Sequence, residues 1–298
     1  MSKISVQLEE IMSRKGYTQS HVARAIGRSP AAISTFLSGK YSGDIKTLES
    51  ELSGFIQRES DKDRLHHLNI DFVPTITAKS GLEVIRMAHL ENDINVIYGA
   101  AGLGKTMMLK EYARRYRDAI LIEADPGYTA LVLLQELCDR LGLSKRGTIH
   151  ELSESCITAL SGTGRAVLID EAENLPYRAL EVIRRIHDKA GVGVVLAGMP
   201  RLILNLKGKR GEYAQLYSRV GFALDLQEKL PQADLQLILT NMVEEANSDS
   251  VFSAFYRASK GNARRLFKLA RGTIRASEIN ATPIDAAMVN KVAGMLIS

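Results

Sequence analysis

The chain has 298 residues, of which 45% are hydrophobic and 24% charged, a composition typical of folded globular proteins and sufficient for one large domain with smaller ones. Its longest apolar runs, such as residues 192–199, are too short to span a membrane, and residues 1–16 lack the apolar segment of a secretory signal, so we expect a cytoplasmic protein without a membrane partner. A net charge of +5 and a pI near 9.1 are compatible with a polyanionic partner but do not establish one.

Short helices are predicted from residue 4 to about residue 56, because apolar side chains recur there with helical spacing. Within them, residues 17–39 closely match a repressor-like helix-turn-helix. Ala23 is small where the two helices would cross, and Gly27 permits the turn. Ser29 can cap the second helix, and Pro30 is tolerated at its first position. A small all-helical domain is expected at this end of the chain.

The second helix of this motif would present its exposed face to a DNA major groove. The candidate DNA contacts on and beside it are Arg28, Ser29, Ser34, Thr35 and Lys40. Few of these side chains can make paired hydrogen bonds to a base, so weak sequence specificity is expected. A helical domain used for protein contacts is the alternative.

A change of pattern separates this domain from the rest. Residues 59–74 are charged and weakly periodic, as in an exposed linker. Beyond them, helical segments alternate with short apolar runs typical of buried parallel strands, at residues 95–98, 119–123, 166–169 and 193–197. Only helices are predicted from residue 231 onward. The expected organisation is a helix-turn-helix domain (1–60), a linker (61–75), an α/β core with a parallel sheet (76–226) and a helical C-terminal lid subdomain (227–298).

Directly after the first apolar run comes Gly-Ala-Ala-Gly-Leu-Gly-Lys-Thr, followed by a helical pattern. This is the phosphate-binding loop GxxxxGK[ST] in its strand-loop-helix context. Its glycines let successive backbone N–H groups and a helix N-terminus face a phosphate. Lys105 would neutralise the β- and γ-phosphates of ATP, and the Thr106 hydroxyl would bind Mg²⁺. The residues predicted to bind ATP here are Gly99, Ala100, Ala101, Gly102, Leu103, Gly104, Lys105, Thr106 and Met107.

A second motif, Ala-Val-Leu-Ile-Asp-Glu at residues 166–171, is an apolar strand that ends in two acids. Asp170 would hold Mg²⁺ through water, and Glu171 would act as general base on the attacking water. The acidic pair favours ATP hydrolysis over ATP binding alone. Neither the histidines nor Cys138 and Cys156 have metal-type spacing, and we expect the two cysteines to be buried apolar side chains.

Four further positions lie where related ATPases usually carry functional residues. Met199 stands where these usually place a polar sensor of the γ-phosphate, and a thioether cannot donate that hydrogen bond, which puts the hydrolysis rate in question. Arg219 is a candidate arginine finger that completes a neighbour's catalytic site, or else a surface ion-pair residue. Arg264 or Arg265, at a helix start in Gly-Asn-Ala-Arg-Arg-Leu, would report the nucleotide state to the lid, with Arg264 preferred.

Basic residues also gather in the core, and their default interpretation is a solvated charged face. If the protein encircles DNA or winds along it, these residues are the expected phosphate contacts. They are Lys145, Arg146, Arg184, Arg185, Lys207, Lys209 and Arg210.

With these motifs in this order, the chain resembles the phage Mu B transposition protein family from about residue 4 to residue 270. The resemblance implies a P-loop AAA+ fold and an ATP-dependent, largely sequence-nonspecific DNA-binding ATPase in a bacterial host cell. Such a protein forms helical filaments on double-stranded target DNA, delivers that DNA to a DDE transposase and stimulates it. The resemblance also implies that Arg219 acts across subunits.

Two alternatives belong to other classes. One is a nucleotide-switched helix-turn-helix transcriptional regulator, which would protect one short operator instead of long, arbitrary DNA. The other is a secretion or membrane-assembly ATPase, which is disfavoured because no hydrophobic anchor follows the ATPase segment.

Overall fold

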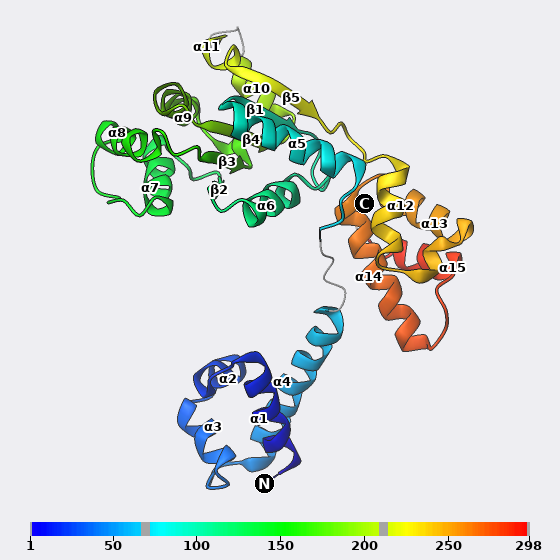
Figure 1. Ribbon diagram of the computed structural model, residues 1–298. Helices are drawn as coiled ribbons and strands as arrows, with labels where there is room; N and C mark the ends of the chain where they lie inside the picture. The colour runs from blue at the N-terminus through cyan, green and yellow to red at the C-terminus, as the bar shows by residue number, and fades with distance from the viewer. Residues whose placement is uncertain (1, 67–71, 209–213, 297–298) are drawn as a thin grey trace. The chain divides into compact units, whose positions relative to one another are not determined.

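The computed structural model describes residues 2–66, 72–208 and 214–296 (Figure 1). The chain divides into two compact units, Met1–Ile70 and Asp71–Ser298. Each unit is described by itself.

The first unit contains four helices in its described part: α1 (Lys3–Lys15), α2 (Gln19–Ile26), α3 (Pro30–Leu37) and α4 (Ile45–His66). Thr18 and Ser29 cap α2 and α3 by accepting a backbone N–H with their hydroxyl oxygens. Gly27 ends α2 in the left-handed conformation, at φ 71°, which glycine adopts without strain. Val22, Ala23 and Ile33 are buried between the helices, as the helix-turn-helix pattern predicts.

The expected linker begins later than its charge suggested. Helix α4 continues to His66, six residues into the range 61–75, a stretch in which Lys, Arg and Leu are good helix formers. Glu59 is buried in the unit, where its carboxylate accepts hydrogen bonds from Lys15 Nζ at 2.8 Å and Tyr17 Oη at 3.0 Å. Charge in this segment therefore reflects a buried ion pair as well as exposure.

The second unit is built on a parallel five-stranded sheet with strand order β2-β3-β4-β1-β5. Each of the four predicted strands is present within one residue of its expected ends, and a fifth strand follows them in the chain. The strands are β1 (Ile94–Tyr98), β2 (Ala119–Glu123), β3 (Ala166–Asp170), β4 (Gly193–Gly198) and β5 (Val220–Asp225).

Helices cover both faces of the strands β1–β4, which explains why these strands are mainly apolar runs, whereas the edge strand β5 is largely exposed. Along β3, Leu168 belongs to one hydrophobic cluster, and its neighbours Val167 and Ile169 belong to the other. The first cluster includes α5 (Ile76–Glu91) and α6 (Lys105–Arg115). The second includes α7 (Ala130–Arg140), α8 (Ile149–Leu160), α9 (Tyr177–Ala190) and α10 (Arg201–Lys207). A 3-10 turn, η1 (Ala172–Asn174), follows β3, and the short α11 (Ala214–Tyr217) precedes β5.

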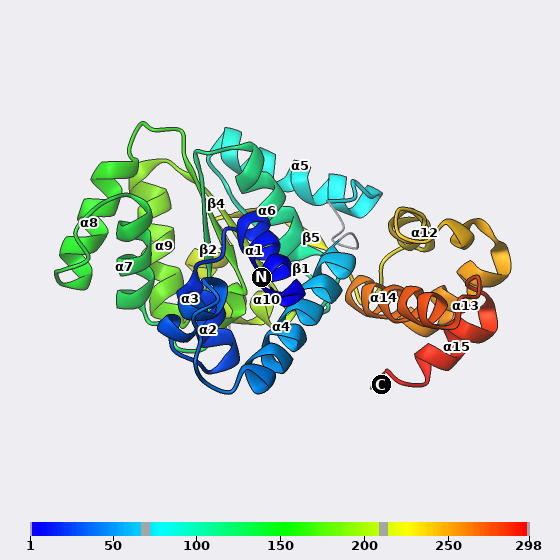
Figure 2. The same ribbon diagram turned by 90° about the horizontal axis from the view of Figure 1, so that it is seen from below.

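After β5 the described chain is helical. Its elements are α12 (Gln232–Thr240), the 3-10 turn η2 (Glu244–Asn247), α13 (Asp249–Ser259), α14 (Ala263–Asn280) and α15 (Ala286–Ala293). In both views this lid bundle lies at one end of the second unit, while α7 and α8 lie at the other (Figures 1 and 2). Buried side chains of the bundle, such as Leu235, Phe255 and Leu266, continue the hydrophobic cluster formed by α5 and α6.

The two cysteines are buried, as predicted. Cys138 on α7 and Cys156 on α8 are both 0% exposed, and their sulfur atoms lie 3.4 Å apart. Burial raises the pKa of the Cys156 thiol, so it behaves as a small apolar side chain. No helix in the described part of the chain is long and apolar enough to cross a membrane.

Helix α5 approaches the sheet so closely that β4 must begin with glycine. A Cβ atom on Gly193 would lie 2.1 Å from the carbonyl oxygen of Ala88. We predict that Gly193→Ala forces α5 off the sheet and costs about 1–3 kcal/mol, as overpacking does. For a unit of this size that lowers Tm by about 2–4 °C per kcal/mol, which calorimetry can measure. An unchanged Tm would mean that α5 can shift freely.

Candidate ATP site

The predicted phosphate-binding loop connects β1 to α6. Gly102 and Gly104 adopt left-handed backbone conformations, at φ 80° and φ 98°, so the loop turns tightly before α6 begins at Lys105. The loop is attached to two strand ends, since the N–H of Gly99 donates to the carbonyl oxygen of Gly198 at 3.3 Å and that of Ala100 donates to Gln227 at 3.0 Å. The resulting concave backbone ends at a helix N-terminus, the geometry that binds phosphate.

The Lys105 ammonium lies within this loop. It donates hydrogen bonds to the carbonyl oxygens of Gly99 and Ala100, each at 2.8 Å. Burial lowers the pKa of Lys105, and the nearby carboxylates of Glu173 and Asp170 partly oppose that shift. A cation at this point, close to carboxylates, can neutralise phosphate oxygens.

The acidic pair lies at the end of β3. Asp170 is the last residue of the strand and only 3% exposed, and its Oδ1 accepts the N–H of Glu171 at 3.0 Å. Glu171 has a left-handed backbone, at φ 52°, which turns its exposed side chain away from the strand direction. Asn174 Nδ2 donates to Glu171 Oε2 at 3.3 Å, and Arg201 donates to Asn174 Oδ1 at 2.8 Å. The sequence pattern did not indicate Asn174 as a contact of the predicted base, or Arg201 as the partner of Asn174.

The lid contacts the phosphate-binding loop through the first residues of α14. Asn262 Nδ2 donates to the carbonyl oxygen of Ala101 at 2.7 Å, while Asn262 Oδ1 caps α14 by accepting the N–H of Arg265 at 3.1 Å. A Cβ atom on Gly102 would lie 2.5 Å from Asn262 Oδ1, so this contact also requires glycine in the loop. The N–H of Arg264 donates to the Gly102 carbonyl oxygen at 3.3 Å.

Of the two sensor candidates, Arg264 is the one placed beside the loop. Its charge lies close enough to Lys105 to contribute to the lowered pKa of the lysine. Arg265 Nε instead donates to the carbonyl oxygen of Ala258 within the lid, at 2.7 Å. This geometry favours Arg264 as the nucleotide sensor.

Arg219 lies at the amino ends of the parallel strands, whereas the phosphate-binding loop lies at their carboxyl ends. Ile94 at the start of β1 is paired with Val220 at the start of β5, so Arg219 precedes β5 while the phosphate-binding loop follows the far end of β1. Strands of five or six residues separate the two ends by roughly 15–20 Å, too far for one side chain to span. Arg219 is therefore not placed to reach the phosphate site of its own chain.

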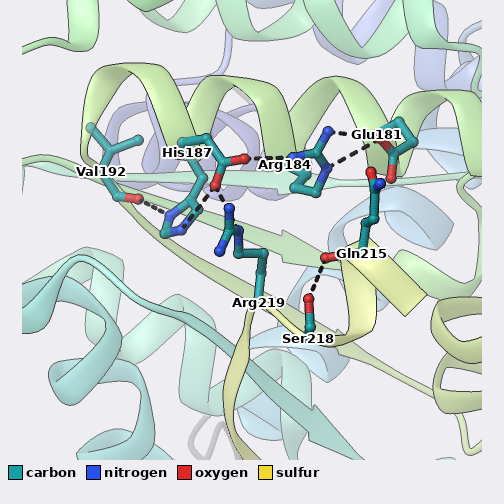
Figure 3. A network of polar contacts seen from close by, with 8 residues as sticks. Glu181, Arg184, His187, Val192, Gln215, Ser218 and Arg219 are labelled. Atoms are coloured by element: carbon teal, nitrogen blue, oxygen red, sulfur yellow. Dashed lines mark hydrogen bonds and ion pairs between the residues drawn. The ribbon is translucent and has the colours of Figure 1, made fainter. Parts of the chain in front are cut away.

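A polar network on α9 holds Arg219 (Figure 3). Its Nε donates to Asp188 Oδ1 at 3.1 Å, and Arg184 connects the same aspartate to Glu181. Arg219 remains 54% exposed in this position. The surface ion pair that the sequence offered as one interpretation of Arg219 is present, and the role of Arg219 as an arginine finger stays a prediction.

The candidate DNA-binding residues of the first unit differ in whether their side chains already bond to other residues of the unit. Arg28 Nε and Nη2 form a two-point ion pair with Glu51, each at 2.8 Å. Ser29 caps α3, and the Thr35 hydroxyl donates to the Ala31 carbonyl oxygen at 2.8 Å. Ser34 and Lys40 are exposed. The structure thus leaves Ser34 and Lys40 the most available of these side chains.

The basic candidates of the second unit come from separate elements. Lys145, beyond α7, pairs with Asp139 at 2.8 Å, and Arg185 pairs with Glu154 at 2.8 Å. The Lys207 ammonium lies 4.9 Å from the centre of the Tyr217 ring. Arg146 is exposed, and Arg184 belongs to the network on α9. Lys209 and Arg210 lie outside the described residues.

Known proteins of similar sequence cover most of the chain. It is 31% identical over 240 residues to the Mu-like prophage FluMu DNA transposition protein B of Haemophilus influenzae, a match that covers 78% of this chain and 82% of that protein. The chain belongs to this family of DNA transposition B proteins. It is also 29% identical over 245 residues to the ATP-dependent target DNA activator B of Escherichia phage Mu, covering 80% of this chain and 77% of that protein. The family resemblance inferred from the motifs is confirmed.

The fold has relatives among AAA-type proteins. Residues 89–206 match the AAA domain family. The ORC2 protein of Aeropyrum pernix superposes with a TM-score of 0.59 at 18% identity, covering 78% of this chain and 71% of that chain. The RuvB Holliday junction branch migration motor of Thermotoga maritima gives 0.52 at 16% identity, covering 74% and 68%. The predicted P-loop AAA fold is confirmed, and family and fold together make the chain an ATPase of this type.

The double role of Asn262 can be separated by substitution. Aspartate retains the oxygen that caps α14 but lacks the donor to Ala101, whereas alanine lacks both. We predict that Asn262→Asp and Asn262→Ala both weaken ATP binding, measured by titration with a fluorescent ATP analogue. Only Asn262→Ala should also lose about 1 kcal/mol of unfolding free energy, the usual cost of a lost cap. Equal ATP affinity in all three proteins would show that the lid contact is not coupled to nucleotide binding.

Proposed function

We propose that this ATPase binds double-stranded DNA with little sequence preference, assembles on it as an ATP-dependent helical filament of identical subunits, and delivers that DNA to a DDE transposase. The observation that carries the proposal is that the residues proposed for ATP hydrolysis lie at opposite ends of the parallel strands. Lys105 and Glu171 lie at one end, and Arg219 lies exposed at the other. A neighbouring subunit in a head-to-tail assembly can bring the two ends together.

Mg²⁺ fits the residues at the carboxyl ends of the strands. Thr106 is the second residue of α6, next to Lys105, and Asp170 ends β3, so a hydroxyl and a carboxylate oxygen are available, the donor types that Mg²⁺ prefers. Among the described residues no group of three or more His, Cys, Asp or Glu side chains could hold a metal ion. This agrees with Mg²⁺ bound by one or two protein oxygens together with ATP phosphates and water, where it would neutralise developing charge.

In this proposal, the residues of the chain have separate roles in ATP hydrolysis. Lys105 neutralises the β- and γ-phosphates, and Glu171 accepts a proton from the attacking water. Arg219 of a neighbour adds positive charge to the transition state. Arg264, beside the loop, relays the nucleotide state to the lid. Hydrolysis would therefore depend on assembly, and assembly on ATP.

DNA binding is assigned to the helix-turn-helix of the first unit together with basic residues of the second. The side chains offered by α3 are short or already bonded, which supports contact with the DNA backbone over reading of bases. The proposal that a transposase is the partner is based on the relatives, one of which is named a target DNA activator. No described helix offers a membrane span that would favour a membrane-assembly role.

The coupling between nucleotide and DNA can be tested with two variants. We predict that Lys105→Ala abolishes ATP binding and with it DNA binding, because the triphosphate charge is left uncompensated. Glu171→Gln should bind ATP and DNA but hydrolyse ATP on the order of 100-fold more slowly, so its filaments persist. Electron microscopy with random linear DNA and a phosphate-release assay report both effects. Lys110→Ala, at an exposed position on the same helix α6, is the matched control and should behave like the wild type.

Two outcomes would count against the proposal. If Lys105→Ala bound DNA with wild-type affinity in the presence of ATP, DNA binding would not depend on ATP binding. Protection of one short sequence, with no assembly on random DNA, would favour a nucleotide-switched transcriptional regulator.

A further inference from the structure

The end of β4 lacks a polar side chain but carries a carboxylate from another element. Met199, which follows β4, is half-buried and apolar where a polar sensor was expected. Against the preceding Gly198 lies the side chain of Glu173, which belongs to η1. A Cβ atom on Gly198 would lie 2.2 Å from Glu173 Oε2, so only glycine at the end of β4 leaves room for this carboxylate.

This carboxylate oxygen is buried without a hydrogen-bond partner among the described residues. The backbone of Glu173 is fixed, since Asn205 Nδ2 on α10 donates to its carbonyl oxygen at 3.1 Å. Burying a carboxylate oxygen without a donor is costly, and such atoms are rare in folded proteins. An oxygen held in this way is available to a donor that the chain itself does not supply.

The position of Glu173 indicates which donor that is. Gly198, against which the Glu173 carboxylate lies, accepts a hydrogen bond from the N–H of Gly99 at 3.3 Å, so this carboxylate lies at the strand end that adjoins the phosphate-binding loop. This carboxylate forms no direct ion pair with Lys105 in the described structure, and Lys105 donates instead to Gly99 and Ala100. The Glu173 carboxylate is therefore not taken up by Lys105. A phosphate oxygen facing Glu173 would be repelled, whereas a water molecule at the γ-phosphate can donate to it.

We propose that Glu173 is a positioning residue for ATP hydrolysis, which orients the attacking water from the end of β4 in place of the polar sensor that Met199 cannot supply. The water oxygen bonds to the γ-phosphorus as the bond to the β–γ bridging oxygen breaks, which releases ADP and phosphate. Glu171 takes one proton of the water. Glu173 accepts a hydrogen bond from the other proton and does not take it.

The inference rests on ATP hydrolysis by this site, and four full-length variants test it. Glu173→Ala removes the acceptor, and Gly198→Ala displaces it with a Cβ atom. Met199→Asn, added to Glu173→Ala, restores a polar group at the end of β4. Glu91→Ala, an exposed carboxylate at the end of α5, is the control. The readouts are kcat, the Kd for a non-hydrolysable ATP analogue with and without Mg²⁺, and Tm.

For Glu173→Ala we expect kcat to fall on the order of 100-fold, the loss typical of a reacting group that is misplaced by about 1 Å. The Kd should stay within about threefold with or without Mg²⁺, and Tm should not fall, because an unpartnered buried carboxylate is lost. Gly198→Ala should lower kcat in the same direction, Met199→Asn should recover part of it, and Glu91→Ala should match the wild type.

An unchanged kcat in Glu173→Ala would overturn the inference while leaving the proposed function intact. A fall in kcat accompanied by an equal loss of ATP affinity or by a lower Tm would also overturn it, because Glu173 would then act in binding or folding. If the wild-type protein did not hydrolyse ATP, with or without DNA, the proposed function would be wrong, and the inference about Glu173 would be wrong with it.

Discussion

Parallel strands end at the same edge of a sheet, and the ATP site of this protein depends on that constraint. The carboxyl ends of β1, β3 and β4 bring together Lys105, Asp170 and Gly198, which are far apart in the sequence. Backbone hydrogen bonds attach the phosphate-binding loop to the ends of β4 and β5, so the loop cannot move independently of them. The same constraint places Arg219 at the opposite ends of the strands, where its side chain cannot reach the phosphate site of its own chain.

The parts of this site that sequence predicted are those in which chemistry is local. A phosphate-binding loop needs glycines, a lysine and a helix start within eight residues, so the strand-loop-helix pattern contained the whole feature. The acids Asp170 and Glu171 at the end of an apolar run were equally local. The strands were predictable because a sheet covered on both faces requires uninterrupted apolar runs. In the first unit, the predicted cap Ser29 shows the same agreement between local sequence and structure.

The parts that sequence missed depend on contacts between distant segments. Asn262 was visible as part of a helix start, but its hydrogen bond to Ala101 joins residues 161 positions apart. Glu173 follows the acidic motif closely in the sequence, but only the structure shows that its carboxylate lies against Gly198 at the end of β4. Likewise, the ion pair of Arg28 with Glu51 changes how a groove-facing arginine is interpreted. Such pairings carry no periodic signal, and they decide which of several polar residues acts.

The central claim is that each complete ATP site takes residues from two subunits. It is tested most directly by mixing Arg219→Ala with Glu171→Gln protein and measuring ATP hydrolysis on DNA as a function of their ratio. Each variant alone should be nearly inactive, while mixed assemblies contain interfaces where an intact Glu171 meets an intact Arg219, so activity should rise to a maximum in the mixture. If both proteins assemble together on DNA and no ratio restores activity, Arg219 does not act across subunits and the account is wrong.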